Sequence, residues 1–516
     1  MSDEVRPTDA GAKPSTASPT EQRVDDDRPA TFREILGVAE YRALFGATAL
    51  SWVGDYFAKV AITVLIFQDT DSVLLSAAAF AISYLPWIVG GPVLAAIAER
   101  YPYRRVMIIC DLVRMVLVGS LAIPGIRLPA LLVILFAASL LTPPFQAARS
   151  ALLPRLLTGD RYVVGLALQN IVSQASQVIG YAVGGTVSAL NPRIGLLINS
   201  TTFALSALLL WRGVRHRPAV MPDTQRNGLL RETRDGFNVV FSHPVMRPIA
   251  LVVFLNVAIL ILPEGLAAGW ADELGGGARA TGLLMAANPI GYTIGGLVIG
   301  RMMAPSTRLK LVKPLLIASP LLLVPALLQP GFGVVFALIL LSGFTGMVTM
   351  PLNGLFVQVL PSAYRARAFG IMQGGMQISH AVAVLSAGAL AQAVGSVPTV
   401  VGVWALVGLG LMLLATMTWP SREVIDTEIA RTRALNEAFE AERSEAGPSD
   451  TDETTTDETQ DRSPAAEAGS QAPREHRSYQ LDTSRQDTAE NPTRSDNEPP
   501  AHSLSGATHA EQVNDA

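Results

Sequence analysis

Long apolar runs separated by short charged stretches make up the chain from residue 41 to residue 420. A run of about 18 or more apolar residues with few charges is typical of a helix that crosses a bilayer. The pattern predicts twelve such helices, at 41–68, 73–98, 105–124, 128–146, 162–189, 194–212, 246–270, 281–303, 311–329, 331–353, 367–394 and 397–419. The expected fold is therefore all-α and integral to a membrane.

Both ends of the chain have a different composition. Residues 1–40 and 421–516 are poor in apolar residues and rich in Asp, Glu, Ser, Thr and Pro, which predicts disordered tails. A charged helix is expected only from Arg422 to about Glu445. The first tail lacks the order of basic, apolar and small residues of a cleavable signal peptide, so the first helix should remain in the protein. Residues 421–516 carry 22 acids and 9 arginines, a net −13, which leaves +9 on the rest of a chain whose total is −4.

Positive charge is distributed unequally over the loops. Consecutive loops of such a chain lie on opposite sides of the membrane. The loops on one side carry 19 arginines and lysines in total, and those on the other side carry only 3, namely Arg127, Arg193 and Arg279. Short loops rich in Lys and Arg stay in the cytoplasm. We therefore expect a multi-pass protein of the inner (plasma) membrane with both termini in the cytoplasm.

The longest internal loop, 213–245, separates an N-terminal half (41–212) from a C-terminal half (246–420), each with six helices. A sequence repeat supports this division. Asn353 precedes Pro361 by the same eight residues that separate Gln146 from Pro154, and Gln169 and Gly184 have counterparts in Gln373 and Gly388. Two pseudo-symmetric halves predict alternating access, in which they rock about a site near the midplane.

Composition narrows the function classes. Half of the residues are hydrophobic, only 16% are charged, and there is one cysteine, so neither an intramolecular disulfide nor a multi-cysteine metal site is expected. No G-x-x-x-x-G-K-[ST] sequence occurs, which argues against an ATP-driven pump. Because no nucleophile elbow, metal cluster or catalytic dyad is evident either, we do not expect an enzyme.

The stretch G-P-V-L-A-A-I-A-E-R-Y-P-Y-R-R, from Gly91 to Arg105, resembles the loop between helices two and three of the major facilitator superfamily. That family has a glycine, an Asp-Arg pair, a second glycine and paired basic residues there. Glu99-Arg100 takes the place of the Asp-Arg pair, Arg104-Arg105 that of the basic pair, and Pro102 that of the second glycine. The resemblance covers about residues 41–420 and implies the twelve-helix major facilitator fold.

Two further stretches look like the branch of drug:proton antiporters that includes macrolide-efflux proteins and the enterobactin exporter. They are S-W-V-G-D-Y in the first helix and V-M-I-I-C-D-L-V-R in the third. The antiporter element Gly-Pro-x-x-Gly-Gly is similar to G-Y-A-V-G-G at 180–185, where Tyr181 stands in place of proline.

Ionisable residues at membrane depth cost roughly 2.5–3.5 kcal/mol each on insertion scales and are therefore candidates for function. Asp55 and Lys59 lie one turn apart in the first helix, with Asp55 about 20 Å from its cytoplasmic start, and this spacing lets them neutralise one another. Glu264 follows Pro263 in the seventh helix with no cation within a turn of it, and the proline predicts a break in the helix there. We predict that Asp55, Lys59 and Glu264 couple transport to protons. The alternatives are a permanent structural pair and a Glu264 at the outer water interface.

Asp111 and Arg114 lie one turn apart in the third helix, near its cytoplasmic end. With the loop residues, they resemble the family's charge network that locks one gate. The predicted cytoplasmic gate network comprises Gly91, Glu99, Arg100, Arg104, Arg105, Asp111 and Arg114. The alternative for Asp111 and Arg114 is a passive pair that reaches toward the interface.

Neutral polar side chains on helices five, eight and eleven are candidates for a substrate cavity, namely Gln177, Tyr181, Asn288 and Gln377. Such residues can equally form bonds between helices, at ~0.6 kcal/mol each. Glycines at small spacings permit close helix contact. In the family that this chain resembles, helices five and eight meet between the halves, so Gly180, Gly184, Gly185, Gly291 and Gly295 are predicted to form this interface.

The combined prediction is an exporter of small amphipathic molecules, of a drug or siderophore type, that exchanges them for protons. It would be driven by the proton-motive force without a cofactor. Its expected partners are the substrate, protons and the lipid bilayer, without nucleic acid, and we expect a monomer. An uptake permease or uniporter on the same fold stays open, as does a membrane sensor or scaffold that acts through the acidic tail.

Overall fold

The computed structural model describes residues 30–89, 100–217 and 229–445. Helix occupies most of the described part of every predicted apolar run. Gly91 and Glu99 of the predicted gate network lie outside the described residues, as do most of residues 1–40, the centre of the 213–245 loop and the tail after Glu445.

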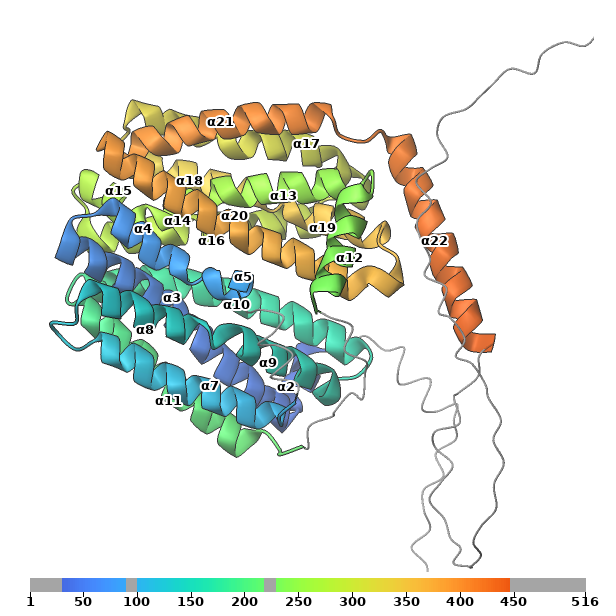
Figure 1. Ribbon diagram of the computed structural model, residues 1–516, viewed down its shortest axis with the longest axis horizontal. Helices are drawn as coiled ribbons and strands as arrows, with labels where there is room; N and C mark the ends of the chain where they lie inside the picture. The colour runs from blue at the N-terminus through green and yellow to red at the C-terminus, as the bar shows by residue number, and fades with distance from the viewer. Residues whose placement is uncertain (1–29, 90–99, 218–228, 446–516) are drawn as a thin grey trace, which may run out of the picture. The chain divides into compact units, whose positions relative to one another are not determined.

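The N-terminal half consists of helices that run side by side (Figure 1). Their bounds are α2 Phe32–Gly37, α3 Ala39–Thr70, α4 Val73–Ile82, α5 Leu85–Val89, α7 Tyr103–Leu121, α8 Leu128–Ser139, α9 Thr142–Leu156, α10 Asp160–Ser188 and α11 Pro192–Gly213. Helix α3 packs against α10 and α11, and α7 also packs against α11. This arrangement places α3 in the interior of the half, with neighbours on several faces.

The C-terminal half repeats this plan with more interruptions. Its helices are α12 Leu229–Ser242, α13 Met246–Leu260, α14 Leu262–Gly265, α15 Ala267–Glu273, α16 Gly277–Met302, α17 Pro305–Leu321, η1 Val324–Leu328, α18 Phe332–Gly346, α19 Thr349–Gln358, η2 Ser362–Tyr364, α20 Arg365–Val394, α21 Val397–Met417 and α22 Arg422–Glu445. The two halves meet where α10 packs on α16 and where α4 packs on α20.

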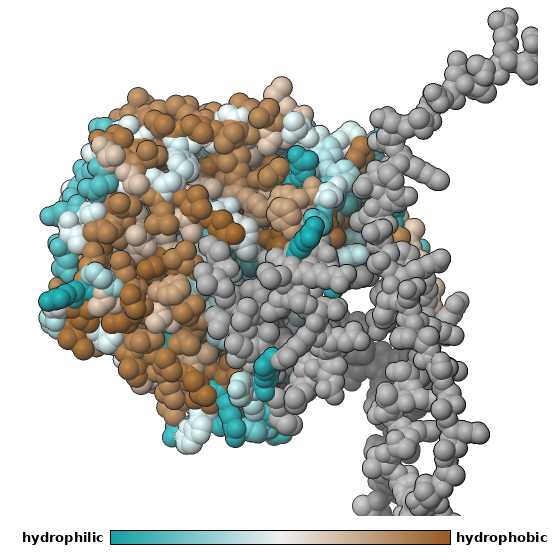
Figure 2. All heavy atoms as spheres, in the orientation of Figure 1, coloured by the Kyte–Doolittle hydropathy of each residue, from teal (hydrophilic) through white to brown (hydrophobic). Residues whose placement is uncertain are grey.

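Nine helical segments within the described ranges are long and apolar enough to cross a membrane. Many large apolar side chains on them face outward, including Val133 at 66% exposure and Leu414 at 60%. Figure 2 shows hydrophobic residues over the middle of the visible face and hydrophilic residues at the ends of the helices. So large an exposed apolar surface requires a lipid environment. The count of twelve spans stays a prediction.

The predicted disordered tail is wrong for its last residues, because helix begins at Phe32. Thr31 and Glu34 form a reciprocal capping box at the start of α2, which satisfies backbone donors that a helix otherwise leaves free. Ile35 is buried against Tyr41, Leu153 and Leu157. A single amphipathic turn was too short to stand out from the polar sequence around it.

The segment 213–245 is likewise not loop throughout, since α12 occupies Leu229–Ser242 and packs against α20 and α13. The predicted charged helix after Pro420 is confirmed as α22, Arg422–Glu445. Thr432 donates to the carbonyl of Val359 at 3.3 Å, and Asn436 accepts from the backbone N–H of Ser362 at 2.9 Å. These bonds attach α22 to the end of α19 and the segment that follows it.

Candidate functional site

Helix α3 carries the charged residues of the site near the middle of its length. Gly54 lets α11 approach closely, because a Cβ there would collide with Asn199 and Thr202. Asp55 follows directly, and Lys59 lies one turn further on. The Thr202 hydroxyl lies 2.8 Å from the carbonyl oxygen and 3.2 Å from the side-chain oxygen of Asn199. The contact between α3 and α11 thus fixes the position of Asp55 relative to the side chains of α11.

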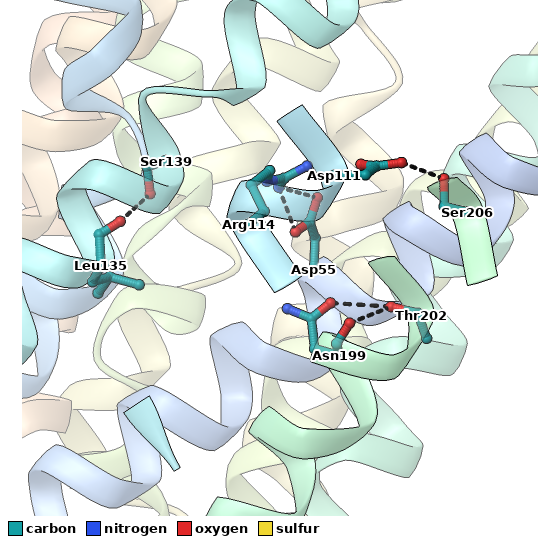
Figure 3. Close-up of polar contacts among 8 residues, drawn as sticks. All are labelled: Asp55, Asp111, Arg114, Leu135, Ser139, Asn199, Thr202 and Ser206. Carbon is teal, nitrogen blue, oxygen red and sulfur yellow. Dashed lines mark hydrogen bonds and ion pairs between the residues drawn. The ribbon is translucent and has the colours of Figure 1, made fainter. Parts of the chain in front are cut away.

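Asp55 pairs with Arg114 of α7 (Figure 3). The Arg114 Nη2 donates to Asp55 Oδ1 at 2.7 Å and to Oδ2 at 2.9 Å. The guanidinium also stacks on Phe203 of α11, with 4.2 Å between its Cζ and the ring centroid. The Arg114 side chain is 6% exposed and that of Asp55 28%. The pair is therefore mostly buried, with the carboxylate on the wetter side.

The expected position of Asp111 and Arg114 near one end of their helix is wrong, whereas their role in a cytoplasmic gate stays a prediction. Both lie in the middle of α7, and Asp111 accepts a hydrogen bond from Ser206 at 2.6 Å (Figure 3). Arg114 turns instead to Asp55. Residues one turn apart on a helix share a face, but the neighbouring helices decide which partner each one meets.

The predicted ion pair between Asp55 and Lys59 is also wrong as a contact. The Lys59 Nζ lies over three aromatic rings, at 5.6 Å from the centroid of Tyr56, 5.4 Å from Phe80 and 5.0 Å from Tyr84. The negative faces of the rings attract the ammonium group. Within the described ranges Lys59 forms no ion pair, although it lies in electrostatic range of Glu264 and Asp55.

Glu264 is buried at 5% exposure rather than at an outer water interface. As predicted, Pro263 accompanies a break: α13 ends at Leu260, and Glu264 lies in the short α14. The Tyr181 hydroxyl of α10 donates to its Oε2 at 3.1 Å, and the Tyr181 ring meets the edge of Tyr56 at 5.2 Å. Glu264 of the second half thus contacts the first half directly.

A cavity of about 210 Å³, here called the Asp55 cavity, lies beside these residues. Its lining includes Asp55, Lys59, Arg114 and, from the second half, Gln377. Gln377 was predicted to line a cavity. Tyr181 is instead fully buried, and Asn288 donates to the carbonyl of Leu260 at 3.0 Å. Among the described lining residues of this cavity, Gln177, Tyr181 and Asn288 are absent.

Residues that the sequence did not single out also belong to the site. Trp52, Tyr84 and Gln146 line the Asp55 cavity, and Arg149 stacks on Trp52 with 4.8 Å between its Cζ and the ring centroid. Gln146 Oε1 and two nitrogens of Arg149 are buried without a hydrogen-bond partner in the described part of the protein. Asn199 and Ser206, seven residues apart on α11, were detectable as polar residues in an apolar run.

The predicted glycine interface is wrong for four of its five members. The Cβ positions of Gly180 and Gly184 face α3, and those of Gly291 and Gly295 face α18, so each packs within its own half. Gly185 does face α16, where its counterpart is Gly282, and a Cβ on Gly185 would lie 2.6 Å from the Gly282 Cα. The glycine spacing predicts a close contact but does not say which neighbour makes it.

The three arginines of the predicted gate network, Arg100, Arg104 and Arg105, lie in different environments. Arg104 Nε donates to the carbonyl of Leu210 at 3.4 Å, and its Nη2 to that of Trp211, so it caps the end of α11. Arg100 and Arg105 are exposed. A role of these three arginines in a gate remains a prediction.

Outside the spanning segments, His243 connects the start of α13 to α22. Its Nδ1 accepts from the backbone N–H of Val245 at 3.2 Å and of Met246 at 3.3 Å, while its Nε2 lies 3.3 Å from Glu428 Oε2. Burial lowers the pKa of His243 from its ordinary value of 6.5, and Glu428 opposes this in part. The neutral imidazole, with Nε2–H donated to Glu428, fits all three contacts.

The fold and the site define a class: a polytopic membrane protein that brings charged residues of two halves to one buried region, as transporters do. The sequence model of the Major Facilitator Superfamily matches residues 44–268 and again 249–446, and the chain belongs to this family of transporters. No curated protein matches the chain.

Solved structures share the fold at low sequence identity. The nucleoside transporter NupG has a TM-score of 0.59 and 14% identity, over 74% of this chain and 100% of that one. A POT family transporter in complex with 5-aminolevulinic acid has a TM-score of 0.58 and 11% identity, over 77% and 99%. A bacterial homologue of the human lysosomal transporter Spinster, inward-facing, has a TM-score of 0.54 and 12% identity, over 77% and 98%.

Proposed function

We propose that the protein exports small amphipathic molecules in exchange for protons, by alternating access of two six-helix halves with both termini in the cytoplasm. The observation that supports this most directly is the position of Lys59 on α3. It lies in electrostatic range of Asp55 in the first half and of Glu264 in the second. Lys59 is thus a cation within range of one carboxylate from each half. Protonation of either carboxylate changes its attraction to Lys59 and so affects the contact between the two halves.

In the proposed cycle, a proton from outside binds Glu264 and removes its negative charge. The Lys59 ammonium is then no longer attracted by Glu264. The remaining attraction comes from Asp55 and the rings of Tyr56, Phe80 and Tyr84. Tyr181, which donates to Glu264, lies on α10 at the contact with α16. Protonation therefore alters a bond that joins the halves, which is what coupling requires.

The Asp55 cavity suits an amphipathic substrate. Trp52, Phe80 and Tyr84 give it aromatic walls, while Gln146 and Gln377 offer neutral polar groups. Gln146 Oε1 has no hydrogen-bond partner among the described residues, and buried polar atoms normally have one. A donor on the substrate, or water, would satisfy it.

The test is dye and drug accumulation in cells that express wild type, Asp55→Asn or Glu264→Gln, with and without a protonophore. We expect wild type to lower accumulation, the protonophore to abolish this effect, and either substitution to return accumulation to the level of the empty vector. Equal membrane levels of all variants must be shown by immunoblot.

Matched controls come from exposed carboxylates near the same helices. Asp69→Asn, near the end of α3, and Asp272→Asn, in α15, each remove one carboxylate that is exposed. Both should export like wild type. If Glu264→Gln also exports like wild type under a proton gradient, Glu264 does not carry the proton.

The second candidate is an uptake permease or uniporter. The likeness to structures of nucleoside and peptide transporters supports keeping it. Proteoliposomes with a defined orientation and an imposed pH gradient distinguish the two. An antiporting exporter moves substrate against the direction of the protons, a proton-coupled uptake permease moves it with them, and a uniporter does not respond to the pH gradient.

A further inference from the structure

A second cavity lies far along the chain from the Asp55 cavity, between the start of α17 and the start of α22. It has a volume of about 800 Å³, and we call it the α17–α22 groove. Lys310 and Lys313 come from the first turns of α17, within the candidate span Thr307–Leu328. Trp419 follows the end of α21 at Met417, and tryptophan is enriched at membrane–water boundaries. The groove therefore lies where a spanning helix begins and another ends.

The rim of the groove is basic. Lys310, Lys313 and Arg422 are exposed, and no ion pair joins them to an acid within the described ranges. Arg308 also lines the groove, but it already donates to the carbonyls of Met303 at 2.9 Å and Gly300 at 2.5 Å. Asp426 is the acid among the described lining residues, so four positive charges face one negative charge.

The wall of the groove is apolar. Val312 and Leu355 are buried, and Ile425 and Ile429, one turn apart on α22, turn the same face toward it. Leu309 is 50% exposed and Met350 51%. Basic groups above an apolar wall match a molecule with an anionic head and a hydrocarbon chain.

We propose that the α17–α22 groove binds one anionic glycerophospholipid. Its phosphate pairs with Lys310, Lys313 and Arg422, and an acyl chain packs against Leu355, Trp419 and Ile429. The lipid fills the space between α22 and the membrane body, beside the bonds from Thr432 to Val359 and from Ser362 to Asn436. This inference does not depend on the transport direction or on proton coupling.

The chain beyond Glu445 is the competing occupant, since it is acidic. A lipid fits better because residues 446–516 are rich in Ser, Thr, Asp and Glu and supply little apolar surface for the wall. The groove also lies at the start of the candidate span Thr307–Leu328, where lipid headgroups would be within reach, and each Lys or Arg near an anionic bilayer strengthens binding by about fivefold.

The experiment uses the full chain in phosphatidylcholine nanodiscs with a minor fraction of brominated phosphatidylglycerol, or of brominated phosphatidylcholine as reference. Bromine on an acyl chain quenches nearby tryptophan, and the difference between wild type and Trp419→Phe isolates the signal of Trp419. We expect more quenching by the anionic lipid than by the reference lipid. In Lys310→Gln/Lys313→Gln/Arg422→Gln the apparent affinity should fall by roughly 100-fold.

The control is Arg301→Gln/Arg365→Gln/Arg433→Gln, which removes three exposed positive charges that are not part of the groove. It should bind like wild type, and its unfolding temperature and that of the groove variant should match wild type. Equal quenching by both lipids, or an unchanged affinity in the groove variant, overturns the proposal. If the anionic lipid quenches Trp419 only after residues 446–516 are deleted, the tail occupies the groove and the proposal is also wrong.

Discussion

At the scale of single residues, the pair of Asp55 and Arg114 carries the sharpest prediction. Asp55→Asn leaves the buried guanidinium of Arg114 without its partner and should lower the free energy of unfolding by about 3 kcal/mol. This value is at the low end for a broken buried ion pair because the Asp55 side chain is 28% exposed. Arg114→Gln should be similarly destabilising. The double variant Asp55→Asn/Arg114→Gln removes both charges and should recover most of the unfolding temperature.

The same variants separate structure from function. If Asp55 also takes part in proton coupling, the double variant regains stability but not export. Unfolding temperatures in detergent and accumulation in cells are measured side by side. A double variant that is as unstable as the single variants would show that the charges do not act as a pair.

At the scale of helices, the contact between α10 and α16 depends on two glycines. A Cβ on Gly185 would lie 2.6 Å from the Cα of Gly282 and 2.9 Å from the carbonyl oxygen of Ala278. Backbone atoms cannot rotate away, so Gly185→Ala must push the helices apart, at a cost of about 1–3 kcal/mol. We expect a lower unfolding temperature and impaired transport.

Gly300→Ala is the matched control on α16, because its nearest atom is the Met350 sulfur at 3.9 Å, an ordinary contact. It should behave like wild type in both measurements. A Gly185→Ala protein with the stability and transport of Gly300→Ala would mean that the halves do not need this close approach.

At the scale of the whole described body, His243 joins distant parts of the chain through Glu428. Its pKa in the folded protein lies below 6.5, chiefly because of burial, so the folded state binds fewer protons than the unfolded state. This contribution to stability is present above pH 6.5 and is lost as the pH falls through the folded-state pKa. The unfolding temperature should therefore drop on acidification.

His243→Gln should make this decrease shallower, whereas the exposed His216 offers a control, His216→Gln, that should leave it unchanged. The measurement is the unfolding temperature from neutral pH to mildly acidic pH. An identical pH profile for wild type and His243→Gln would rule out titration of His243 as a cause.

The sequence predictions that depend on local sequence were mostly confirmed, whereas several that depend on contacts between helices were wrong. The length of an apolar run predicts a spanning helix because the thickness of the membrane sets how many apolar residues such a helix needs. Every described run is largely helical. The helix break beside Pro263 and the helix Arg422–Glu445 were predicted for equally local reasons. The expected contact of Asp55 with Lys59, which proved wrong, relied on neighbours within one helix.

The sequence by itself determined that this protein is helical and built for a membrane, and it singled out Asp55, Lys59 and Glu264 as costly charges in apolar surroundings. Only the tertiary structure decided their partners: Arg114 for Asp55, aromatic rings for Lys59 and Tyr181 for Glu264. The reason is physical. Periodicity tells which residues share a helix face, but a buried charge takes the partner that the packing of other helices brings within a few ångströms.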